Sequence, residues 1–107
     1  MVSEEVLRQA TERLVARFHP DRIILFGSQA RGTADKHSDV DLLVILPIRG
    51  NRWDLMVEMD RALDDVRMPS EVVVLSPEEF ERDRHIPGTI ARPACREGKV
   101  LYERFES

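Results

Sequence analysis

Residues 26–44 read FGSQARGTADKHSDVDLLV. A glycine–serine turn ends one apolar run, and Asp39 and Asp41, separated by a single valine, open the next. Side chains alternate across a strand, so both carboxylates are expected on one face, about 6.5–7 Å apart along the chain. Two such carboxylates repel each other unless positive charge lies between them. The pattern therefore leaves two interpretations, solvated acids at a strand end or a site for hard cations.

The composition is that of one small globular domain, which we expect to span residues 1–107. Hydrophobic residues make up 42% and charged residues 34%, the balance of a folded chain. The net charge of −4 argues against general nucleic-acid binding, which needs a basic surface. The N-terminal residues lack a signal-peptide pattern, and the longest apolar run is too short to span a membrane. We therefore expect a cytoplasmic protein that does not bind a membrane.

Alternating helix and strand patterns predict an α/β (α+β) domain, a small mixed β-sheet with flanking helices. Helical spacing predicts helices over residues 4–18, 51–66 and 90–97. A further helix is expected after Ser76, because SPEEF carries the serine, proline and glutamate of a capped helix start. Short β-branched runs predict strands over residues 22–26, 40–46, 71–75 and 99–103.

The glycine–serine turn adds chemistry that suits a phosphate. Gly27 allows close backbone approach, and Ser28 offers a hydroxyl and an N–H group to a phosphate oxygen. Arg31 could meet further phosphate charge, with a structural ion pair as the alternative. Glu71 opens the third expected strand, either as a third carboxylate at the same end of the sheet or as a plain strand-start residue. Together these residues favour the chemistry of a nucleotide bound with Mg²⁺.

Gly27-Ser28, ten residues and then Asp39-Val40-Asp41 make the pattern G-S-x10-D-x-D. This pattern resembles the nucleotidyltransferase superfamily related to DNA polymerase β, and the string LFGSQARG…SDVDLLV resembles its minimal, MNT-type members. EVVVLSPEEF and RPACREGKVLYE are also similar to those members, so the resemblance covers residues 23–103. It implies the nucleotidyltransferase fold, a phosphate-binding turn at Gly27 and Ser28, and two Mg²⁺ ions held by Asp39 and Asp41. Glu71 falls at the family's third acid, which binds the catalytic metal.

The resemblance also implies an activity and a partner. The expected reaction transfers a nucleotide, AMP from ATP, to a hydroxyl group. Similar minimal proteins pair with a HEPN-domain protein in toxin–antitoxin systems, where the nucleotidyltransferase modifies a tyrosine of the toxin. The third acid is usually aspartate, and the extra methylene of Glu71 moves its carboxylate by roughly 1.5 Å. Two alternatives therefore stay open: an antitoxin that acts by binding alone, and transfer to a small molecule.

Several residues outside this motif have two interpretations each. Trp53 and Tyr102 either pack at the edge of the core or belong to a partner interface, and self-association stays open. Four arginines form a basic patch that is either a solvated face or a contact for nucleotide phosphates or an acidic partner: Arg82, Arg84, Arg92 and Arg96.

Overall fold

The computed structural model describes residues 4–27, 40–66 and 70–104. In chain order its elements are α1 (Glu4–Phe18), β1 (Arg22–Phe26), β2 (Val40–Ile45), α3 (Arg52–Ala62), β3 (Ser70–Leu75), α4 (Pro77–Asp83), α5 (Ala91–Glu97) and β4 (Lys99–Glu103). The strands form one mixed sheet in the order β3-β2-β1-β4. Strand β1 is antiparallel to β2 and to β4, while β2 is parallel to β3.

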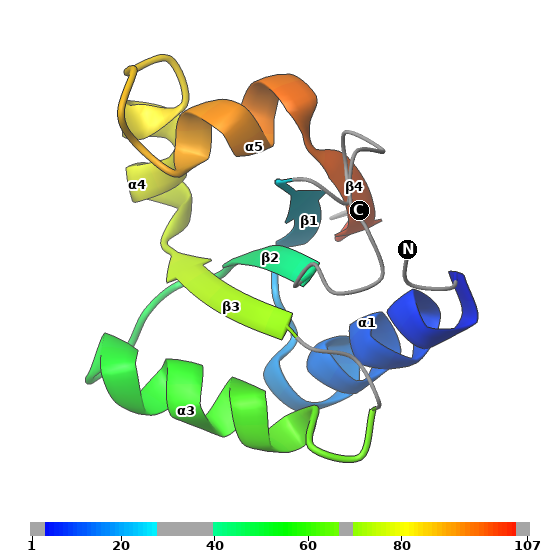
Figure 1. Cartoon of the computed structure of the whole chain (residues 1–107). Helices are drawn as coiled ribbons and strands as arrows, with labels where there is room; N and C mark the ends of the chain where they lie inside the picture. The colour runs from blue at the N-terminus through cyan, green and yellow to red at the C-terminus, as the bar shows by residue number, and fades with distance from the viewer. Residues whose placement is uncertain (1–3, 28–39, 67–69, 105–107) are drawn as a thin grey trace.

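Helices cover both faces of this sheet (Figure 1). Helices α1 and α3 lie on one face, where Leu14, Val44 and Met59 belong to one buried cluster. Helices α4 and α5 lie on the other face, where Leu43 and Phe80 belong to a second cluster. A strand buried on both faces needs apolar side chains at nearly every position, which explains the run VDLLVI in β2. The predicted fold class is confirmed.

The start of α4 is capped as the sequence predicts. The Ser76 hydroxyl accepts the N–H of Glu79 at 3.1 Å, and the Glu79 carboxylate accepts the N–H of Ser76 at 2.9 Å. Arg52, in the first turn of α3, donates to the same carboxylate at 2.6 Å. The guanidinium of Arg52, followed by the Ser76 N–H, lowers the pKa of Glu79 from 4.5 to about 2. This ionised side chain therefore ties α4 to α3.

Helix α3 is shorter than the apolar spacing predicts. Asn51 caps its start by accepting the N–H groups of Trp53 and Asp54. The helix ends at Ala62, so the prediction that it continues to residue 66 is wrong. Leu63 donates to the carbonyl of Asp60, a tighter turn than an α-helix makes. Leu63 and Val66 are nevertheless buried, which is why the apolar spacing outlasts the helix.

Trp53 and Tyr102, which the sequence leaves either at the edge of the core or in a partner interface, differ in their surroundings. Tyr102 is half-buried and packs against the cluster beside α1, whereas Trp53 is 68% exposed. Within the described ranges, no helix is long and apolar enough to cross a membrane.

Candidate functional site

Pairing between strands brings together acids that lie thirty positions apart in the sequence. Asp41 of β2 is the direct partner of Glu71 in the parallel β3, and of Phe26 in the antiparallel β1. Adjacent strands lie about 4.8 Å apart, and residues in register project from the same face. Leu43 and Val73, two positions further along, pack in the cluster under α4 and α5. Asp41 and Glu71 therefore project from that face, at the end where β2 and β3 begin.

Gly27 follows β1 at this edge and contacts the carboxylate of Asp41 closely. Its φ is +76°, a left-handed conformation that favours glycine. A Cβ atom at this position would lie 3.2 Å from Cγ of Asp41 and would overlap its Oδ2. The space that any other side chain would need is thus taken by the carboxylate. The glycine of the motif consequently fixes where this acid can lie.

The described part of the predicted site consists of Gly27, Asp41 and Glu71, and the structure brings all three to one edge of the sheet. Asp41 is half-buried and Glu71 is exposed. Ser28, Arg31 and Asp39 lie outside the described residues.

The donor set fits a hard cation, because carboxylate oxygens are the ligands that Mg²⁺ prefers. Among the residues that the structure describes, no three histidine, cysteine or acidic side chains gather as a metal site. The two described acids make a pair, and the place of Asp39 in the sequence supplies the third carboxylate of the predicted set. Metal binding by Asp39, Asp41 and Glu71 stays a prediction.

One neighbour of the site carried no signal in the sequence. Phe26 pairs directly with Asp41 and packs partly against the cluster under α4 and α5. It lines the site with an apolar ring, and a terminal phenylalanine of an apolar strand gives no hint of such a position.

Most arginines of the predicted basic patch are occupied within the domain. Arg82 binds Asp83 at 2.8 Å, and Arg84 binds Glu81 at 3.0 Å. Arg92 donates to the carbonyl of His85 at 3.0 Å. These contacts favour the interpretation of a solvated, ion-paired face over that of a phosphate-binding surface.

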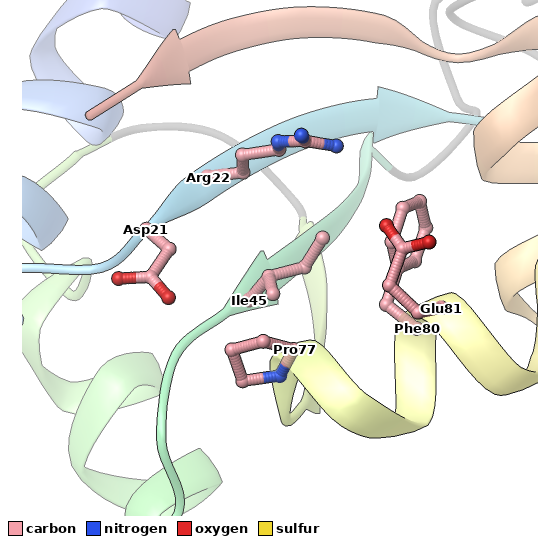
Figure 2. Close-up of a pocket in the computed structure, with 6 residues that line it drawn as sticks. All are labelled: Asp21, Arg22, Ile45, Pro77, Phe80 and Glu81. Carbon is pink, nitrogen blue, oxygen red and sulfur yellow. The ribbon is translucent and has the colours of Figure 1, made fainter. Parts of the chain in front are cut away.

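A small hollow between the sheet and α4 lies far from the paired acids (Figure 2). Figure 2 shows Arg22 projecting from β1 while Phe80 and Glu81 rise from α4 across the gap. Arg22 pairs with Ile45 at the end of β2 opposite to Asp41, and its guanidinium lies 6.0 Å from the Phe80 ring centroid. The hollow measures about 120 Å³. Small-molecule sites usually exceed roughly 300 Å³, so it is too small for a nucleotide.

Comparisons with known proteins agree with the fold described above. The chain is similar to a candidate nucleotidyltransferase from Sulfolobus solfataricus, with a TM-score of 0.66 and 22% identity over 94% of this chain and 79% of the other. It is also similar to a toxin–antitoxin structure with AMP-PNP (TM-score 0.56, 24% identity, 91% of this chain and 73% of the other). An aspartate-to-glutamate double mutant of the toxin–antitoxin MntA–HpeT matches with a TM-score of 0.56 and 20% identity, over 96% and 75% of the two chains. At these identities, the likeness establishes the fold.

A comparison with curated protein sequences gives no significant match. The family model described as "Nucleotidyltransferase domain" matches residues 7–90, which include both strands of the acid pair and the glycine turn. The chain therefore belongs to the nucleotidyltransferase domain family.

Proposed function

We propose that this chain transfers AMP from ATP to a hydroxyl group of a toxin protein and thereby acts as its antitoxin. The observation that carries the proposal is the direct pairing of Asp41 with Glu71. The Asp41 carboxylate also occupies the space that a side chain in place of Gly27 would need. Family membership supports nucleotidyl transfer. The structural neighbours that are toxin–antitoxin complexes, one of them with AMP-PNP, support the choice of acceptor and nucleotide.

In this proposal Asp39, Asp41 and Glu71 hold two Mg²⁺ ions. When bound, such ions neutralise triphosphate charge and lower the pKa of the attacking hydroxyl. The backbone of Gly27 and the hydroxyl of Ser28 bind the triphosphate. The acceptor oxygen forms a bond to the α-phosphorus while the bond to pyrophosphate breaks, and Glu71 takes up the hydroxyl proton.

The acceptor is proposed to be a tyrosine hydroxyl of a HEPN-domain toxin. The structural neighbours that are toxin–antitoxin complexes support a second protein as the source of the hydroxyl.

The experiment incubates the purified chain with α-labelled ATP, Mg²⁺ and the protein encoded beside it. We expect label on that protein, and loss of the label with Asp39→Asn combined with Asp41→Asn. The matched control is Asp54→Asn combined with Glu58→Gln, which removes two exposed acids of α3 and should leave labelling intact. Absence of label with the native chain would overturn the proposed transfer. If the partner is still inhibited by both proteins, the domain acts by binding alone.

Glu71 can be tested separately because its side-chain length is the unusual feature. Glu71→Gln should abolish labelling, whereas Glu71→Asp should keep it or raise it, since aspartate restores the acid usual at this position. Titration with Mn²⁺ and AMP-PNP supplies a readout independent of turnover. Equal metal binding by the native chain and Glu71→Gln would remove Glu71 from the proposed metal site.

A further inference from the structure

Trp53 is the most exposed large apolar side chain of the described residues, at 68% exposed. It lies in the first turn of α3, where its N–H donates to the side chain of Asn51 at 2.8 Å. The capped turn therefore presents a bulky ring on a fixed backbone. Tryptophan at such a position is typical of the residues that dominate the binding energy of protein interfaces.

An open hollow of about 550 Å³ lies beside this turn, between the segment that follows β2 and the start of α4. Pro47 and Ile48 contribute apolar surface to its lining, and Arg52 and Glu79 form the ion pair at its side. We call the surface made by Trp53 and this lining the Trp53 patch. Arg52, which precedes Trp53 in the same turn of α3, lines this hollow, so one partner can cover both the ring and the hollow.

The remaining charges of the Trp53 patch are Arg49 and Glu78, both exposed. Within the part of the chain that the structure describes, neither forms an ion pair. The Trp53 patch therefore offers one uncompensated positive charge and one uncompensated negative charge. A partner of a single charge sign would satisfy only one of them.

We propose that the Trp53 patch binds a second copy of the same chain across a two-fold axis. A two-fold interface joins one surface to itself, so that each residue meets a different residue of the other copy. Arg49 of one copy would then face Glu78 of the other, twice over, and each Trp53 would enter the hollow of the other copy. The paired opposite charges are the feature that a self-complementary surface requires.

The position of the Trp53 patch keeps this dimer separate from the candidate active site. Arg49 and Arg52 follow the end of β2, and Glu78 follows the end of β3, whereas Asp41 and Glu71 lie where these strands begin. In Figure 1 the start of α3 and the start of α4 lie together at the end of the sheet to which the β3 arrow points. The candidate active site of each copy would therefore remain accessible in the dimer. The inference does not rest on the proposed transfer.

Sedimentation equilibrium over a range of protein concentrations tests the proposal. We expect a monomer–dimer equilibrium, and we expect Trp53→Ala to raise the dimer dissociation constant by about 10-fold or more. Thermal unfolding should change little, because the ring is mostly exposed. A native chain that stays monomeric at every concentration would overturn the inference, as would a Trp53→Ala variant that dimerises like the native chain.

Charge reversal provides the sharper test. Arg49→Glu alone or Glu78→Arg alone places like charges across the two-fold axis, so each variant should be more monomeric than the native chain. Mixing the two variants restores both opposite pairs, so the mixture should form a heterodimer. Arg61→Glu, an exposed charge at the other end of α3, is the matched control and should dimerise normally. A mixture no more associated than its components would refute the proposed pairing of Arg49 with Glu78.

Discussion

Replacing Gly27 by alanine should damage catalysis as well as the fold. Two effects contribute. The positive φ of +76° costs an alanine roughly 1–2 kcal/mol. The added Cβ would also overlap Oδ2 of Asp41 and lie 3.2 Å from its Cγ. Carbon contacts prefer about 3.5–4.0 Å, and the overlap at Oδ2 is more severe than the contact at Cγ, so the carboxylate must move by about 1 Å. A displacement of about 1 Å can lower a rate about 10²-fold.

Gly50→Ala is the matched control for this substitution. Gly50 has a φ of +81°, and a Cβ there would meet nothing within 4 Å. It therefore carries the backbone cost without the contact on Asp41. Both variants should lose roughly 1–2 kcal/mol of unfolding free energy for φ, and Gly27→Ala about 1–3 kcal/mol more if Asp41 resists the shift.

The assay measures label transfer from α-labelled ATP and Mn²⁺ affinity for each variant, with thermal unfolding alongside. Gly50→Ala should keep native turnover and native metal affinity. Gly27→Ala should lose about 10²-fold in turnover and bind Mn²⁺ more weakly. Equal turnover and equal metal affinity in the two variants would show that the position of the Asp41 carboxylate does not depend on the missing side chain of Gly27.

Three further predictions concern stability. Glu79→Gln should lower the free energy of unfolding by about 1 kcal/mol, because it weakens the helix cap. The pKa of Glu79 is depressed from 4.5 to about 2 in the folded chain. The stabilisation by its carboxylate is therefore present above pH 4.5 and is lost as the pH falls to about 2. Denaturant titrations of both proteins across that range should converge at low pH, and parallel curves would contradict the assignment. Gly98→Ala should cost about 1–3 kcal/mol, since its Cβ would overlap the backbone oxygen of Ala94 and would lie 2.5 Å from Cγ2 of Ile24; an unchanged melting temperature would count against these contacts. Met59→Ala, at a fully buried position, should cost about 2–5 kcal/mol in urea unfolding, and a loss below 1 kcal/mol would show that the core relaxes into the space.

Much of the fold follows from local sequence patterns. The capped start of α4 needs only Ser76, Pro77 and Glu79, whose mutual contacts span one turn. Helix α1 begins with acids and ends before Pro20, and its bounds match the prediction over residues 4–18. These features depend on residues close in sequence, so tertiary contacts did not shift the predicted start of α4 or the bounds of α1.

The end of α3 shows where local patterns fail. Leu63 and Val66 continue the apolar spacing of the helix and are buried, yet the backbone leaves the helix after Ala62. Apolar spacing indicates only which side chains are buried, and a turn can bury the same side chains as a helix. Likewise, the sequence lists four arginines in a short span, but only the folded chain pairs Arg82 with Asp83 and Arg84 with Glu81.

The candidate motif could be read from local spacing: the glycine turn, the alternation that predicts Asp39 and Asp41 on one face, and the family to which the pattern belongs. Only the folded chain places Glu71 directly opposite Asp41 and brings the Asp41 carboxylate into the space that a side chain in place of Gly27 would need. The packing of the folded chain also leaves Trp53 exposed. Spacing within a strand is a local property of the backbone. The register between strands and the surroundings of a side chain are set by the packing of distant segments, which no local pattern records.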